Sequence, residues 1–107
     1  MPNVRWVWWH AVPYAVDIII YNDECEGIQN AESLAIVLAS GASILSGPAA
    51  PIVSTIGGAL AAATFWQFKY ANKKGGNRGV VARFMLLPQL SIFPYFSPLH
   101  EIYPDLV

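Results

Sequence analysis

Four basic side chains gather in one short segment and are the residues best suited to bind an anion. Lys69, Lys73, Lys74 and Arg78 lie within "KYANKKGGNRG" (69–79). This segment is not a P-loop, because it lacks the G-x-x-x-x-G-K-[ST] spacing and its basic residues precede the glycines. A cationic turn of this kind can contact lipid phosphates or another anion. The alternative interpretation is a solvated turn that joins a helix to a strand.

No arrangement of nucleophiles, carboxylates or histidines points to catalysis or metal binding. Cys25, the only cysteine, stands between Glu24 and Glu26, whose negative charge disfavours the reactive thiolate. His10 and His100 lie far apart, and neither belongs to a pair with metal-ligand spacing. No Ser, Cys or carboxylate pair has the setting of a catalytic centre. We therefore expect no enzyme, no metal, no cofactor and no small-molecule substrate.

Aromatic side chains cluster in two places and suggest contact with a lipid interface. Trp6, Trp8 and Trp9 form the first cluster, and Phe65 and Trp66 belong to the second. Amphipathic aromatic rings collect at the headgroup layer of membranes. The alternative is packing within the core or between neighbouring strands.

The 36 residues between Glu32 and Lys69 contain no charged side chain. Over the whole chain, 55% of the 107 residues are hydrophobic and only 12% are charged, about half the usual charged share. A monomer with so few polar groups exposes apolar patches. This composition predicts self-association, a membrane or an apolar partner that covers those patches.

Small residues within the uncharged stretch recur at helical spacing. Such stripes allow two helix backbones to approach closely, as they do where helices associate in lipid. We expect this face to contact a membrane or other copies of the chain through Ala35, Ala39, Ser43, Ser54, Gly57, Gly58 and Ala62.

The elements expected to position these residues follow from periodicity and turn signals. Residues 3–22 are rich in Trp, Val, Ile and Tyr and predict β structure that is broken at Pro13. Residues 23–29 predict an acidic, turn-like connection. Asn30 is a suitable N-cap for a helix that should end near Ser46, and a second helix should start at Pro51. The "SGPAAP" bend between them suits an antiparallel helical hairpin over residues 30–74.

The remainder, residues 79–107, predicts a strand followed by an extended, aromatic-rich tail that is interrupted by Pro88, Pro94, Pro98 and Pro104. The expected fold is a single α+β domain, residues 1–107. It has a central antiparallel helical hairpin flanked by N- and C-terminal β segments, in the order β-α-α-β. The two β segments could pair with each other.

Function is expected to lie in membrane activity or in self-assembly. A net charge of −1 does not favour nucleic acid. The first residues form no convincing signal peptide, and the localisation stays open between release and membrane association. The favoured hypothesis is a pore-forming or bacteriocin-like protein that oligomerises and inserts its Gly/Ala-rich hairpin, a similarity of type that transfers no residue. The alternative is a non-enzymatic structural protein that forms a soluble homo-oligomer through the same hairpin.

Overall fold

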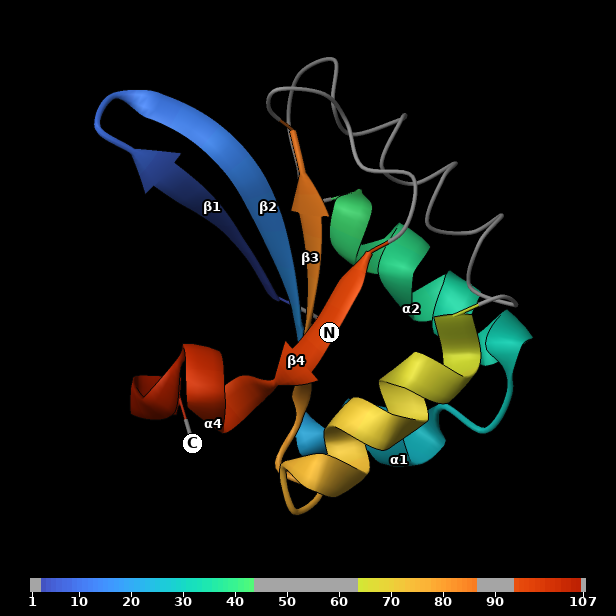
Figure 1. Ribbon diagram of the computed structural model, residues 1–107. Helices are drawn as coiled ribbons and strands as arrows, with labels where there is room; N and C mark the ends of the chain where they lie inside the picture. The colour runs from blue at the N-terminus through green and yellow to red at the C-terminus, as the bar shows by residue number, and fades with distance from the viewer. Residues whose placement is uncertain (1–2, 44–63, 87–93, 107) are drawn as a thin grey trace.

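A four-stranded antiparallel sheet forms the centre of the protein (Figure 1). The structure, a computed structural model, describes residues 3–43, 64–86 and 94–106. The strands are adjacent in the order in which they occur along the chain, as β1 (Asn3–Trp9), β2 (Val12–Ile20), β3 (Val80–Met85) and β4 (Tyr95–Pro98). This order makes β1 and β4 the two edges of the sheet.

The inner strands β2 and β3 are almost entirely apolar, which explains their central position. Residues 15–20 of β2 are all buried, and Val80, Val81, Ala82 and Phe84 of β3 are buried as well. Their register runs from Ala15 opposite Met85 to Ile20 opposite Val80. Strands that are buried on both faces read as near-continuous hydrophobic runs rather than as alternating patterns.

Three helical segments cover one face of the sheet. They are α1 (Asn22–Gly27), α2 (Ala31–Ala42) and a helix over residues 64–74. The predicted N-cap at Asn30 is confirmed, because its side chain accepts a hydrogen bond from the Ser33 N–H and the Ser33 side chain accepts one from the Asn30 N–H. The last helix ends in a turn where Gly76 and Asn77 have φ values of 74° and 59°, a conformation that glycine and asparagine tolerate best.

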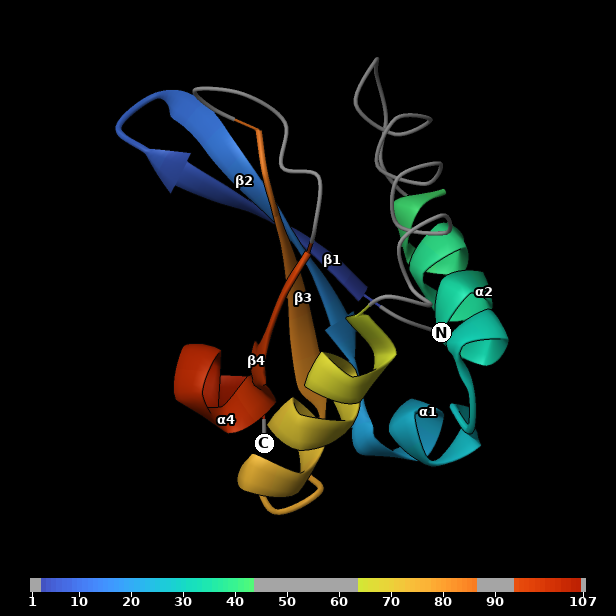
Figure 2. The same cartoon turned by 45° about the vertical axis from the view of Figure 1, so that its right-hand side comes forward.

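Helical segments lie on both sides of the sheet (Figure 2). A hydrophobic layer lies under each of them. The larger layer lies under the helices and includes Ile18, Leu34, Leu38, Phe68 and Phe84. The smaller layer is covered by α4 (Leu99–Ile102) and the 3-10 helix η1 (Pro104–Leu106). In it, Ile19, Val81 and Leu99 are buried, with Ile102 and Leu106 packed against them.

The predicted β-α-α-β layout with a central helical hairpin is wrong. The centre of the fold is the sheet, because β2 and β3 pair directly and bury their apolar side chains on both faces. The expected break at Pro13 lies instead at the β1–β2 turn, and Pro13 is accommodated within β2. Much of the predicted hairpin, residues 44–63, lies outside the described residues.

Two further segments differ from expectation. The acidic turn expected at residues 23–29 contains the short helix α1. The tail expected to be extended forms β4, α4 and η1, because Pro98 and Pro104 stand where proline suits a helix: Pro98 is the N-cap of α4, and Pro104 opens η1. Proline has no backbone N–H, and neither position requires one.

Within the described ranges, no helix is both long enough and apolar enough to serve as a membrane span.

Candidate functional site

A row of charged side chains crosses the face of the sheet that α4 and η1 cover. Arg5 on β1 lies opposite Asp17 on β2, and Asp17 lies opposite Arg83 on β3. Each of these residues is the only charged residue of its strand. Because residues directly opposite in neighbouring strands share one face of a sheet, the carboxylate lies between two guanidinium groups.

Asp17 is fully buried and its carboxylate accepts three hydrogen bonds. The Arg83 guanidinium donates from Nε to Oδ1 at 2.7 Å and from Nη2 to Oδ2 at 2.8 Å, a bidentate geometry that gives strong, directional pairing. The Tyr103 hydroxyl donates to Oδ2 at 2.5 Å. The hydrogen bond to Asp17 also raises the pKa of Arg83, which keeps the guanidinium charged.

Arg5 connects the same row to the C-terminal segment. Its guanidinium carbon lies 4.8 Å from the centre of the Tyr103 ring, a cation–π distance. Its Nη2 lies 3.9 Å from Oδ2 of Asp105, which is a largely exposed ion pair. We name Arg5, Asp17, Arg83, Tyr103 and Asp105 the Asp17 cluster. Its contacts fasten the segment that carries α4 and η1 onto the sheet.

The position of Tyr103 makes stability depend on pH in the alkaline range. Burial, together with the hydrogen bond to Asp17, raises the pKa of Tyr103 to about 12, whereas a tyrosine in an unfolded chain titrates near pH 10. Since the folded pKa is the higher one, the stabilisation is complete below about pH 10 and is lost as pH rises through 12. The free energy of unfolding of the wild type should therefore fall toward that of Tyr103→Phe as the pH rises from about 10 to 12. Urea titrations of both proteins measure this gap, and a constant gap would contradict the assignment.

The β1–β2 ribbon beyond the charged row carries no Asp, Glu, Lys or Arg. We name residues 6–16 the arm. Its turn exposes Trp8 at 58%, Trp9 at 69% and Val12 at 44%, and His10 lies against the Trp9 ring with centroids 4.9 Å apart. In Figure 1 the turn end of the arm projects past the end of β3, whereas Ala15 and Val16 at its base pair with β3. A two-stranded ribbon is marginally stable in water without a surface to pack against.

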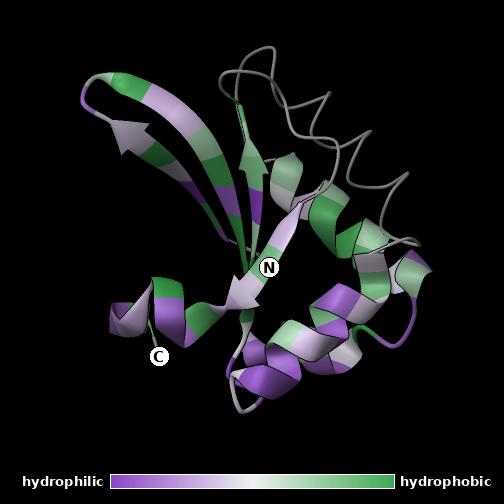
Figure 3. Ribbon diagram, viewed as in Figure 1, coloured by the Kyte–Doolittle hydropathy of each residue, from purple (hydrophilic) through white to green (hydrophobic). Residues whose placement is uncertain are grey.

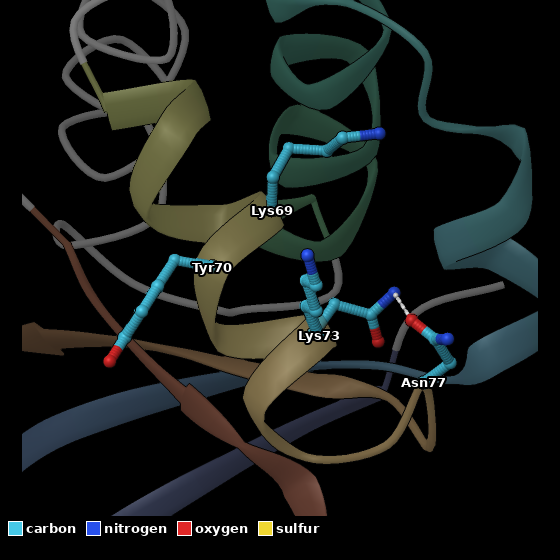
Figure 4. Close-up of a pocket in the computed structure, with 5 residues that line it drawn as sticks. Lys69, Tyr70, Lys73 and Asn77 are labelled. Carbon is cyan, nitrogen blue, oxygen red and sulfur yellow. Dashed lines mark hydrogen bonds between the residues drawn. The ribbon is translucent and has the colours of Figure 1, made fainter.

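A pocket of about 380 Å³ lies on the helix over residues 64–74 and the turn that follows it, lined by Lys69, Tyr70, Asn72, Lys73 and Asn77 (Figure 4). The Asn72 Nδ2 donates to Asn77 Oδ1 at 3.3 Å and fixes one wall. Two lysines spaced i, i+4 repel each other, and neither forms an ion pair with another described residue. An anion between them would relieve that repulsion, so the pocket is suited to a small anionic group.

The predicted basic site is thus partly brought together. Lys69 and Lys73 share the pocket, while Lys74 and Arg78 are exposed and do not line it. All four lie away from the arm: the turn ends at Gly79, and the next residue, Val80, pairs with Ile20 at the far end of β2. The nine residues of β2 span about 30 Å at 3.4 Å per residue. Figure 3 shows polar residues over α1 and the end of this helix, and also on the C-terminal segment and at the β1–β2 turn.

The other predicted contact residues divide into exposed and packed groups. Trp8, Trp9 and Trp66 are exposed, whereas Trp6 and Phe65 pack against the larger hydrophobic layer. On α2, Ala35 packs partly against that layer, Ala39 is half-buried and Ser43 is exposed. The other members of the predicted stripe, Ser54, Gly57, Gly58 and Ala62, lie outside the described residues.

Cys25 has the character of a structural cysteine. It is buried, and its Sγ donates to the Ile20 carbonyl at 3.5 Å. Burial and, to a smaller extent, the Glu24 charge raise the pKa of the thiol to about 12. The expected effect of the neighbouring carboxylates is confirmed, although burial contributes more. Among the described residues, no three His, Cys, Asp or Glu side chains converge closely enough to hold a metal ion.

The Asp17 cluster was absent from the sequence-based predictions, yet the sequence contains a signal for it. Asp17 is the single charge in the apolar run Ala15–Ile20, and Arg83 is the single charge in "VVARFM". Buried charges in proteins are almost always paired. Two isolated, opposite charges in two strands that could pair therefore predict an ion pair. Tyr103 and Asp105 give no such signal, because their positions depend on how the tail folds back.

In comparisons with known proteins, no family model matches this chain, and neither a curated protein nor a solved structure shows significant similarity to it.

Proposed function

We propose that this chain is a membrane-active protein whose arm makes first contact with a lipid bilayer and whose uncharged segment then inserts and self-associates. The arm is the observation that carries the proposal. It combines eleven residues without a formal charge with two exposed tryptophans at its turn. Exposed aromatic residues without nearby carboxylates are suited to the interface between headgroups and acyl chains.

The distribution of charge along the sheet supports one orientation. Polar residues cover α1, the end of the helix over residues 64–74 and the C-terminal segment (Figure 3), and the turn of the arm lies at the end of β2 away from the basic residues of that helix. The uncharged segment from Ser33 to Phe68 adds a second stretch that can enter an apolar phase without transferring a charge. In this proposal the arm makes the first contact with lipid. Lys69 and Lys73 bind an anion at the opposite end of the sheet.

Release of a trapped dye from liposomes tests the proposal. Wild-type protein should release dye from vesicles that contain anionic lipid, and Ala59→Asp should abolish release, because a carboxylate in the middle of the inserting segment costs about 3 kcal/mol or more in a bilayer. Gln29→Asp adds the same charge at an exposed loop outside the segment and should leave release unchanged. Release that survives Ala59→Asp contradicts insertion of this segment.

A soluble homo-oligomer is the second candidate, and the same exposed tryptophans favour it. Trp8, Trp9 and Trp66 can be covered by another copy of the chain as well as by lipid. The liposome experiment distinguishes the two functions, because a structural protein leaves vesicles intact at every lipid composition.

A further inference from the structure

The outer edge of β1 is unpaired within the described part of the chain and has the features of a pairing surface. No described strand lies beyond β1. The other edge strand, β4, has four residues and ends in Pro98, whereas β1 has seven residues with no proline, lysine or carboxylate. Proteins usually protect edge strands with short length, proline or charge. By length and proline content β4 is the better protected edge; β1 carries one charge, Arg5, which is paired with Asp105, and one register irregularity between Val7 and Trp8.

Two hydrogen bonds show which backbone groups of β1 point outward. The Val4 N–H donates to the Asn3 side chain at 2.8 Å rather than to β2. On β2, the Tyr14 carbonyl accepts from the Leu86 N–H, so the alternation of that strand directs Val16 and Ile18 toward β3.

The two hydrogen bonds agree on the register of β1. Val4 and Trp6 pair with Ile18 and Val16, so their N–H and C=O groups face away from β2. The register shifts between Val7 and Trp8, because β2 carries one extra residue, Tyr14, at this point. The extra residue is on β2, so β1 keeps its own alternation, and Trp8 lies opposite Pro13, which has no N–H to offer a ladder. The outer edge of β1 therefore presents the N–H and C=O groups of Val4, Trp6 and Trp8.

We propose that a second copy of this chain pairs with β1 in antiparallel fashion about a two-fold axis at Trp6. In this register Val4 lies opposite Trp8 of the partner subunit, and Arg5 lies opposite Val7 of the partner subunit. No two charges are placed directly opposite each other, and each exposed Trp8 gains a β-branched neighbour. The strand thus complements itself.

Self-pairing also explains why the partner is a copy and why assembly stops at two. An isologous contact uses the same edge on both subunits and leaves none of it free. The edges that remain are the two short β4 strands, which end in Pro98. An eight-stranded sheet with protected edges does not extend further.

The dimer has a consequence that rests on the proposed function. An antiparallel pair places the two arms at opposite ends of the joint sheet and covers part of Trp8. A dimer cannot insert both arms into one bilayer surface, so it is the form of the protein in lipid-free solution, and the monomer is the form that first contacts lipid.

Light scattering in lipid-free buffer, with two variants at one position, tests the interface. Wild type should have twice the monomer mass of 11.7 kDa. Val4→Pro removes an N–H that β2 does not use and should raise the dimer dissociation constant at least tenfold. Val4→Ala makes a comparable loss of packing but keeps the N–H, and it should remain a dimer. A monomeric wild type, or a Val4→Pro protein that dimerises like wild type, would overturn the proposal.

Amide hydrogen exchange provides a test that needs no variant. In dilute protein, the amides of Trp6 and Trp8 should exchange rapidly while those of Arg5 and Val7, which face β2, are protected. In concentrated protein all four should be protected, and unchanged exchange at Trp6 and Trp8 would overturn the pairing. Neither experiment contains lipid, so the dimer and the membrane activity can fail independently.

Discussion

Asp17→Asn is expected to lower the free energy of unfolding by about 3–5 kcal/mol, the usual cost of removing one partner from a buried ion pair. The carboxylate is fully buried and accepts from both Arg83 and Tyr103. The amide keeps the shape of the side chain but leaves the Arg83 charge uncompensated and replaces one acceptor oxygen by a donor. Urea unfolding at neutral pH, followed by circular dichroism, measures the loss.

Asp105→Asn is the matched control for this prediction. It makes the same chemical change on the same face of the sheet, but the Asp105 side chain is 67% exposed and its distance to Arg5 is 3.9 Å. Exposed pairs of this kind contribute about 0–1 kcal/mol. If the two substitutions cost the same, the Asp17 cluster does not fasten the C-terminal segment to the sheet.

The double variant Trp8→Ala, Trp9→Ala should bind anionic vesicles at least about 100-fold more weakly than wild type. Each ring is more than half exposed, and burying a large apolar side chain contributes about 1.5–3 kcal/mol. Two rings together therefore account for about 3 kcal/mol or more, and 1.4 kcal/mol corresponds to a tenfold change in affinity. Sedimentation with vesicles of increasing lipid concentration gives the partition coefficients.

Tyr95→Ala is the control for loss of aromatic surface alone. Tyr95 is 65% exposed but lies on β4, outside the arm. Its removal should change vesicle binding by less than about threefold. Equal losses for Tyr95→Ala and the arm variant would mean that the protein binds lipid through general hydrophobicity rather than through its arm.

Local signals in the sequence predicted parts of the fold, and long-range pairing decided the rest. The N-cap at Asn30 was predicted, and so was the β character of residues 3–22 and of the strand at the start of residues 79–107. Capping chemistry and β-branched runs act over a few residues, so they can be recognised locally. The position of the sheet at the centre of the fold was not predicted. The sequences "AVDIII" and "VVARFM" show no alternation, and no nearby turn joins them. More than 60 residues separate Asp17 from Arg83, and only the folded register reveals that they face each other.

For the candidate sites, too, local features were predicted from the sequence and features that depend on the folded chain were not. Lys69, Lys73, Lys74 and Arg78 were predicted as an anion contact because four basic residues fall within one short segment, which is a local feature of the sequence. Asn72 and Asn77 complete the pocket through a turn with positive φ at Gly76 and Asn77, which the "GGN" sequence permits but does not specify. The exposure of Trp8 and Trp9 required knowing that β2 extends past β3.

Quenching of tryptophan fluorescence by lipids brominated in their acyl chains tests most directly whether the arm enters a bilayer. Replacing Trp6 and Trp66 by Phe leaves Trp8 and Trp9 as the only tryptophans of the chain. With anionic vesicles, brominated lipid should quench most of the emission of this protein, and dimerisation alone cannot produce such quenching. Emission that is equally bright with brominated and ordinary lipid, under conditions where the protein sediments with the vesicles, would contradict the account.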